Sequence, residues 1–236
     1  MPLSGTSLSS TSLSEWTDPD VLPAAEAAAL LAGAPWTRLA TLGDSVAEGV
    51  REPVPGYRDL SWADRVEEAL RAVTPGLAAL NLGRRDRVAA QVAAEQLGPA
   101  LDFGPDLAIV AAGGNDMLRP HFNADEVRRE LTSIVSALRT TGADVVTIGL
   151  FDLTAAGLGP VRYREVMSAR TRQLNDIAAE VAAAHDACHV ATPYDHPTAA
   201  DPGIYSTDRL HLNARGHAFA AANTVRALAT RYLASE

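Results

Sequence analysis

Short apolar runs alternate with longer stretches of mixed polarity along most of the chain. From Trp36 onward, five runs of four to six residues are mostly apolar, and several are bordered by Gly, Pro or Asn. Such runs are typical of strands that are buried on both faces of a parallel sheet. They predict strands over residues 38–42, 77–80, 107–112, 145–150 and 188–191.

The longer stretches are rich in residues that favour helices, and some begin with a capping residue. Ser61 precedes one of them as an N-cap, and Asn123, followed by Glu126 three residues later, resembles a capping box. The alternation of strands and helices predicts an α/β fold, a three-layer α/β/α sandwich with a mostly parallel five-stranded sheet, as in flavodoxin-like proteins. The predicted helices cover residues 24–31, 62–73, 88–97, 124–139, 162–184 and 214–233.

The N-terminal residues differ in composition from the rest of the chain. Residues 2–14 are rich in Ser, Thr and Gly, a composition that cannot bury enough apolar surface to fold. We therefore predict a disordered tail over residues 1–23 and a single domain over residues 24–236. A chain of 236 residues is long enough for one such domain with a sizeable core.

Charge and composition narrow the class of partner. The formal net charge of -9 argues against a nucleic-acid partner or an anionic membrane surface, and no apolar stretch is long enough for a membrane span. The beginning of the chain lacks the pattern of a secretory signal, so we expect a cytoplasmic protein. The histidines do not have metal-ligand spacing and no cofactor motif is present, so we expect neither a metal nor a cofactor.

Polar residues gather directly after three of the predicted strands and before the last helix. The carboxyl ends of parallel strands lie at one edge of a sheet, where active sites of such folds form. The four groups are Gly43-Asp44-Ser45, Asn81-Leu82-Gly83, Gly113-Gly114-Asn115-Asp116 and Asp208-Arg209-Leu210-His211.

These groups contain the side chains needed for nucleophilic catalysis. A serine hydroxyl needs a base to remove its proton, and an imidazole oriented by a carboxylate is suited to this near neutral pH. His211 and Asp208 can supply both from one turn. The backbone N–H of Ser45 and the side-chain amide of Asn115 are candidate donors to the oxyanion of a tetrahedral intermediate.

On these residues the chain resembles the SGNH hydrolases, a branch of the GDSL lipases and esterases. The Gly-Asp-Ser block, the Gly-x-Asn-Asp loop and the Asp-x-x-His block occur in the family's order over residues 38–233. The resemblance implies that Ser45 is the nucleophile, His211 the base, Asp208 its partner and Asn115 an oxyanion-hole residue. It implies a serine esterase that hydrolyses a small-molecule carboxylic ester through an acyl-enzyme.

One position departs from the family pattern. The resemblance implies an oxyanion-hole glycine a few residues after Asn81, often the fifth, and the fifth residue here is Asp86. Gly83 is the alternative if the loop is shorter. Asp tolerates a left-handed backbone, but a carboxylate about 5 Å from the oxyanion would cost roughly 3 kcal/mol at an effective dielectric constant of 20.

Other interpretations of the same residues remain open at this stage. Asp86 motivates a second hypothesis, an acyltransferase or specialised biosynthetic enzyme with the same triad, and a third is a non-catalytic binding protein on this scaffold. Asp44, Asp116 and Glu48 are interpreted as structural residues that hold loops. His217 is expected to be packed or exposed on the last helix.

Overall fold

The computed structural model describes residues 13–233, and a single sheet organises them. All of its strands are parallel, and their order is β2-β1-β3-β4-β5. After β1 the chain adds β2 on one side and then β3, β4 and β5 on the other. The connections that follow β1 and β3 therefore leave in opposite directions, and open α/β sheets bind ligands in the gap between two such strand ends. The strands are β1 (Arg38–Gly43), β2 (Ala78–Asn81), β3 (Leu107–Ala111), β4 (Asp144–Ile148) and β5 (Cys188–Val190).

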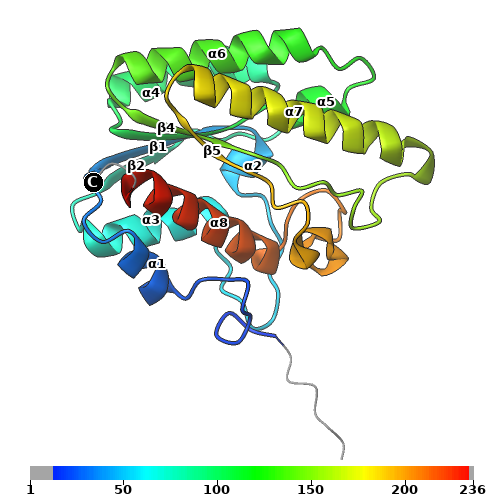
Figure 1. Ribbon diagram of the computed structural model, residues 1–236, viewed down its shortest axis with the longest axis horizontal. Helices are drawn as coiled ribbons and strands as arrows, with labels where there is room; N and C mark the ends of the chain where they lie inside the picture. Colours follow the sequence, from blue (N-terminus) through cyan, green and yellow to red (C-terminus); the bar gives the residue numbers. More distant parts are fainter. Residues whose placement is uncertain (1–12, 234–236) are drawn as a thin grey trace, which may run out of the picture.

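Helices cover both faces of the sheet and complete the three layers. Figure 1 shows α4, α6 and α7 on one face and α1, α3 and α8 on the other. The long helices are α1 (Ala24–Leu30), α3 (Trp62–Val73), α4 (Ala89–Phe103), α6 (Ala124–Thr140), α7 (Arg164–Ala184) and α8 (Ala214–Leu233). Two short helices, α2 (Ser45–Glu48) and α5 (Gly114–Leu118), follow β1 and β3, and short 3-10 turns lie at Val161–Tyr163, Pro197–Ala200 and Pro202–Ile204.

The core lies in two apolar layers, one on each face of the sheet. Successive strand residues point to opposite faces, so Leu39 packs toward α1, α3 and α8 whereas Ala40 and Leu42 pack toward α4, α6 and α7. Both faces of the central strands are thus buried, which explains why the strands read as continuous apolar runs. The predicted α/β fold with a five-stranded, mostly parallel sheet is confirmed.

The predicted elements all occur, and most boundaries agree within two residues. The largest difference is in α4, which was predicted to end at residue 97 because Gly98 and Pro99 follow. The helix continues to Phe103, with Pro99 exposed on its outer side and Ala100 fully buried in the core. Burial of the next turn therefore outweighs the local preference of Gly and Pro.

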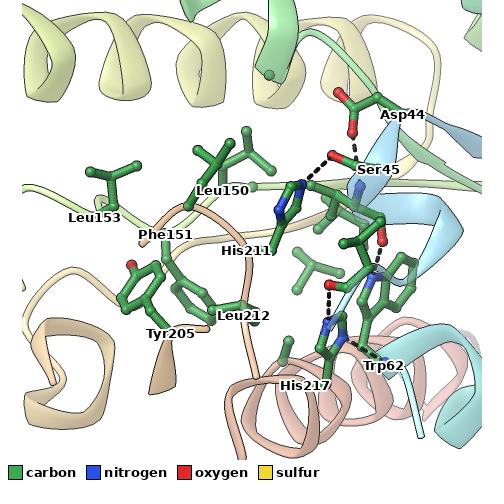
Figure 2. A pocket seen from close by; sticks show the side chains of 18 of the residues that line it. Asp44, Ser45, Trp62, Leu150, Phe151, Leu153, Tyr205, His211, Leu212 and His217 are labelled. Carbon is green, nitrogen blue, oxygen red and sulfur yellow. Dashed lines mark hydrogen bonds between the residues drawn. The ribbon is translucent and has the colours of Figure 1, made fainter. Parts of the chain in front are cut away.

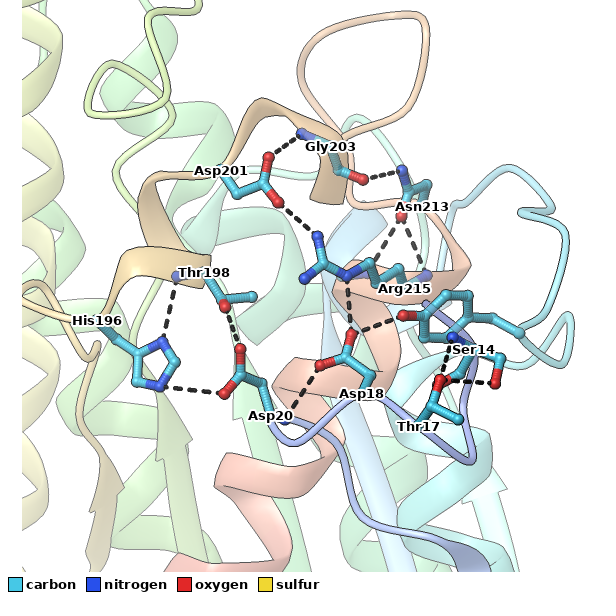
Figure 3. A network of polar contacts seen from close by, with 12 residues as sticks. Ser14, Thr17, Asp18, Asp20, His196, Thr198, Asp201, Gly203, Asn213 and Arg215 are labelled. Atoms are coloured by element: carbon cyan, nitrogen blue, oxygen red, sulfur yellow. Dashed lines mark hydrogen bonds and ion pairs between the residues drawn. The ribbon is translucent and has the colours of Figure 1, made fainter. Parts of the chain in front are cut away.

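The segment before α1 differs from the predicted tail. Residues 13–23 lie against the domain, and we call residues 14–21 the N-terminal strap (Figure 3). Glu15 is buried and forms ion pairs with Arg65 at 2.7 Å and Arg58 at 2.8 Å. Residues 1–12, the rest of the predicted tail, lie outside the described residues.

A second buried carboxylate of the strap joins it to the start of α8. Asp18 accepts a hydrogen bond from the Tyr57 hydroxyl at 2.6 Å and pairs with Arg215 at 2.9 Å. Arg215 also pairs with Asp201, as Figure 3 shows. The ordering of the strap was missed because the charged partners of Glu15 and Asp18 are far away in the sequence.

Candidate active site

Ser45 lies at the first turn after β1, and the tightness of that turn requires a glycine. Gly43 has φ +145°, and a Cβ atom on it would lie 1.9 Å from the carbonyl oxygen of Ala111 in β3. The turn therefore brings β1 into direct contact with β3, and only glycine fits there. Ser45 then begins α2, at the end of the sheet where β1 and β3 diverge.

His211 reaches Ser45 from the loop before α8, across 166 residues of sequence. The His211 Nε2 atom lies 2.8 Å from the Ser45 Oγ atom, as Figure 2 shows. On the other side of the ring, Nδ1 lies 2.6 Å from Asp208 Oδ2. The structure therefore brings together the three predicted triad residues in the order serine, imidazole and carboxylate.

The Asp208 carboxylate also shapes the turn that carries His211. Its Oδ1 atom accepts hydrogen bonds from the backbone N–H groups of Leu210 at 2.9 Å and His211 at 3.0 Å. Arg209 has a positive φ of 60°, which closes the turn. Burial acts to raise the pKa of Asp208, but these hydrogen bonds together with that to the His211 ring lower it. Asp208 is therefore ionised at neutral pH and can accept a hydrogen bond from the Nδ1–H group of His211.

Glu52 holds this loop from outside, a role that sequence analysis missed. Its carboxylate accepts hydrogen bonds from the backbone N–H and the hydroxyl of Thr207, the residue before Asp208. Its backbone carbonyl accepts the N–H of Ala214, the first residue of α8, at 2.9 Å. Glu52 thus ties both ends of the loop to the connection after α2, and no local sequence pattern signals that contact.

Two further carboxylates hold the loops around Ser45. Asp44 is buried and accepts hydrogen bonds from the N–H groups of Val46, at 3.0 Å, and Gly114. Burial raises the pKa of Asp44 to about 6 despite these bonds. Asp116 accepts the N–H of Ala89, at the start of α4, at 2.8 Å. The contacts agree with the predicted structural role of both residues.

Asn115 and Ser45 line the same cavity, whereas neither Gly83 nor Asp86 does. The N–H of Gly83 is donated to the Asn81 side chain at 2.8 Å, and a Cβ on Gly83 would lie 2.3 Å from the Glu48 nitrogen. Gly83 therefore allows β2 to approach α2 closely. Glu48 itself pairs with Arg85 at 3.0 Å, which supports its structural interpretation.

Asp86 has a left-handed backbone conformation, which glycine adopts most readily and Asp tolerates. Its φ is 65°, and the neighbouring Arg87 accepts a hydrogen bond at its carbonyl from the Asn115 amide at 3.0 Å. The Asn115 side chain thus lies next to the segment that contains Asp86. Within residues 13–233, no group of three or more His, Cys, Asp and Glu side chains is arranged to hold a metal ion, and no described helix is long and apolar enough to cross a membrane.

Comparison with known families identifies the family of this chain. The model of the GDSL-like Lipase/Acylhydrolase family matches residues 41–219, a span that includes Ser45, Asn115, Asp208 and His211. The chain belongs to this family. As a family member the protein is a carboxylic ester hydrolase, and the predicted resemblance to SGNH and GDSL hydrolases is confirmed. No match to a curated protein was found.

Solved structures share the fold at low sequence identity. LAE5, an alpha/beta hydrolase enzyme from the metagenome of Lake Arreo, Spain, is 20% identical with a TM-score of 0.66, over 84% of this chain and 95% of that chain. Axe2, an acetylxylan esterase from Geobacillus stearothermophilus, is 20% identical with a TM-score of 0.64, over 84% and 94% of the two chains. These likenesses show a common fold.

Proposed function

We propose that this ester hydrolase is a serine esterase in which Ser45, His211 and Asp208 form the catalytic triad. The observation that carries the proposal is the continuous chain of contacts from Ser45 Oγ through the His211 ring to the Asp208 carboxylate, at 2.8 and 2.6 Å. With the Nδ1 proton held by Asp208, the Nε2 lone pair faces the serine hydroxyl.

The reaction proceeds in two acyl-transfer steps. His211 takes the hydroxyl proton of Ser45 as the oxygen attacks the ester carbonyl carbon, and then gives that proton to the departing alcohol. The product of this first step is an acyl-enzyme on Ser45. A water molecule then loses a proton to His211 and attacks the acyl carbon, which releases the carboxylic acid and returns the proton to Ser45. Asp208 stabilises the imidazolium in both steps without taking its proton.

The oxyanion is stabilised by the Ser45 N–H, the Asn115 side-chain amide and the Asp86 N–H. Asp86 is the better candidate for the third donor because the N–H of Gly83 is already donated to Asn81. The left-handed conformation of Asp86 and its proximity to Asn115 through Arg87 support this assignment. Each such donor contributes about 3 kcal/mol to stabilisation of the transition state.

The triad is tested by hydrolysis of 4-nitrophenyl butyrate and by labelling with a fluorophosphonate. We expect Ser45→Ala to lower kcat by at least a thousandfold and to abolish labelling, because no other nucleophile among residues 13–233 is hydrogen-bonded to His211 Nε2. The matched control is Ser133→Ala, at an exposed position on α6, which is expected to retain both labelling and turnover. Labelling and turnover that persist in Ser45→Ala would contradict the proposed triad.

The same experiment addresses acyl transfer. Added methanol or glycerol competes with water for the acyl-enzyme, and the ratio of ester to acid products measures the preferred acceptor. We expect acid as the main product in dilute alcohol. If the fraction of ester among the products were far above the mole fraction of the alcohol in the solvent, an acyltransferase with this triad would be indicated instead.

A further inference from the structure

A largely apolar cavity begins at Ser45 and crosses the carboxyl ends of the strands. Its volume is about 120 Å³. Its lining comes from the residues that follow β1, β3, β4 and β5, among them Ser45, Asn115, Leu150 and Ala191, and from α8 through Ala220. Adjacent strands are spaced about 4.8 Å apart, so the crossing from β1 to β5 measures roughly 14 Å.

The mouth of the cavity is also apolar. Leu118 and Leu210 line it, and their side chains are among the most exposed large hydrophobic residues of the described chain, at 39% and 40%. Within the described residues, no Arg lines the cavity, and its one lining carboxylate, Asp44, is buried and already accepts hydrogen bonds. The cavity therefore offers no countercharge to an ionic substrate.

The polar groups on the walls are mostly occupied. The Thr224 hydroxyl donates to the Ala220 carbonyl at 2.9 Å, and the Trp62 indole N–H donates to the Val46 carbonyl at 2.7 Å. Ile148 and Val190, the last residues of β4 and β5, add apolar side chains to the same lining. This lining is suited to a chain of methylene groups and poorly suited to a sugar, whose hydroxyl groups need partners.

From this lining we infer that the cavity holds the aliphatic acyl chain of the substrate ester. The inference rests on the proposed function, because it places the ester carbonyl at Ser45. A volume of about 120 Å³ accommodates roughly the first four to six carbons of the acyl chain once the ester group is in place. The substrates are therefore esters of short- to medium-chain fatty acids.

Two buried polar atoms set the limit of the chain. The Tyr205 hydroxyl and the Asn223 side-chain nitrogen both belong to lining residues, and neither has a hydrogen-bond partner within the described residues. Figure 2 shows Tyr205 beyond Leu150 and Phe151 as seen from Ser45, and Asn223 lies beside the end of β5. A longer chain would press its methylene groups against these buried polar atoms, which need a hydrogen-bond partner that a methylene group cannot supply.

The inference is tested with 4-nitrophenyl esters from acetate to palmitate. Burial of each methylene group is expected to raise kcat/KM by up to about fourfold until the cavity is filled. We expect kcat/KM to increase at least tenfold from acetate to octanoate and to fall again at palmitate. A kcat/KM that is highest for acetate would overturn the inference.

Substitutions in the cavity wall test whether the dependence of kcat/KM on acyl chain length arises in this cavity. Ala220→Phe fills the space beside α8, so we expect the ratio of kcat/KM for octanoate to that for acetate to fall at least tenfold. Ala220→Leu is a smaller change that serves as the test in case Ala220→Phe does not fold. We expect it to shift the optimal acyl chain to fewer carbons. The matched control, Ala183→Phe on the exposed face of α7, should keep the wild-type ratio. An unchanged ratio in folded Ala220→Phe and Ala220→Leu would also overturn the inference.

Ethyl and octyl fluorophosphonates separate the two proposals. Faster inactivation by the octyl compound supports both. Equal rates, or a faster reaction with the ethyl compound, leave the triad in place and overturn the acyl-chain assignment. No reaction with either compound, together with no ester hydrolysis, overturns the proposed function and with it the inference.

Discussion

At the scale of single residues, Asp86 combines a backbone role with an unfavourable charge. The segment needs a left-handed residue there, and Asp adopts that conformation more readily than most side chains. Its carboxylate, however, adds a negative charge to the residue proposed to donate the third hydrogen bond to the oxyanion. Arg85 and Arg87 flank it in sequence, but each is paired elsewhere, with Glu48 and Glu95 respectively.

Three substitutions of Asp86 separate conformation from charge. Asp86→Gly and Asp86→Asn remove the charge and keep access to positive φ, so we expect both to raise kcat severalfold. Asp86→Ala also removes the charge, but a left-handed alanine costs roughly 1–2 kcal/mol, so its kcat should stay below that of Asp86→Asn. The kcat for 4-nitrophenyl octanoate measures both effects. Equal kcat in all four proteins would show that Asp86 does not contribute to the oxyanion hole.

His217, on α8 in the wall of the cavity, is a buried histidine with both ring nitrogens in hydrogen bonds. Its Nδ1 atom accepts the N–H of Trp62 at the start of α3 at 3.0 Å, and its Nε2 atom donates to the Val50 carbonyl at 3.1 Å. Burial lowers the pKa of His217 to about 4, and the charges of Arg51 and Arg65 act in the same direction. The folded protein therefore requires this ring to be neutral.

The lowered pKa of His217 predicts a loss of stability in mild acid. The unfolded ring binds a proton near pH 6.5, whereas the folded ring does so only near pH 4. The stabilisation from the neutral ring is therefore complete above pH 6.5 and is lost as the pH falls toward 4. The free energy of unfolding lost in this way is about 2–3 kcal/mol by pH 4.5. We expect the free energy of unfolding in urea to fall by that much more between pH 7.5 and 4.5 in the wild type than in His217→Gln.

The exposed His121 provides the control for this measurement. His121→Gln changes an exposed position away from the core and should retain the wild-type pH dependence. Asp44 has a raised pKa of about 6, so its contribution to the free energy of unfolding decreases as the pH rises from 3.8 through 6. This contribution is the same in all three proteins and cancels in the comparison. Identical pH dependence in His217→Gln and the wild type would refute the assignment.

At the scale of elements, the N-terminal strap joins α3 to the start of α8 through buried ion pairs. Glu15 pairs with the buried Arg65, so its removal leaves a guanidinium in the interior without its countercharge. We expect Glu15→Gln to lower the free energy of unfolding at pH 7 by about 3–5 kcal/mol. The exposed Glu26→Gln, in the first turn of α1, should change it by less than about 0.5 kcal/mol.

Acid titration provides a second readout of the strap. Burial acts to raise the pKa of Glu15, but hydrogen bonds from Arg65 and Arg58 and the charge of Arg65 lower it to about 2. Its stabilisation is therefore present above about pH 4.5 and is lost as the pH falls toward 2. The difference between wild type and Glu15→Gln should narrow over that range. A difference that is small at pH 7 would show that the strap does not stabilise the domain.

The elements that sequence predicted well are those whose signal is local. The strands and long helices follow from runs and periodicity, and α3 has the bounds predicted from Ser61 and the pattern after it. The short helices α2 and α5 were missed because each begins directly at a functional turn, at Ser45 and at Gly114, without a periodic stretch of its own. The ordered strap was missed because its stabilising partners are distant in sequence.

At the scale of the whole molecule, the motifs predicted which side chains meet but not the space around them. Ser45, Asp208 and His211 were predicted from type and spacing, and the sheet brings them together because the loops containing them lie at one end of the strands. The cavity has no comparable signature. Its walls come from single apolar residues of several separate segments, and each of them reads in the sequence as ordinary core.

The order of the strands divides the triad residues between two halves of the chain. The first half of the chain supplies β2, β1 and β3 with Ser45, and the second half supplies β4 and β5 with the loop of His211. Within the sheet, these halves are joined only along the β3–β4 seam. Ester cleavage therefore requires both the pairing of β3 with β4 and the docking of α8, so the onset of turnover in a refolding sample reports when these long-range contacts have formed.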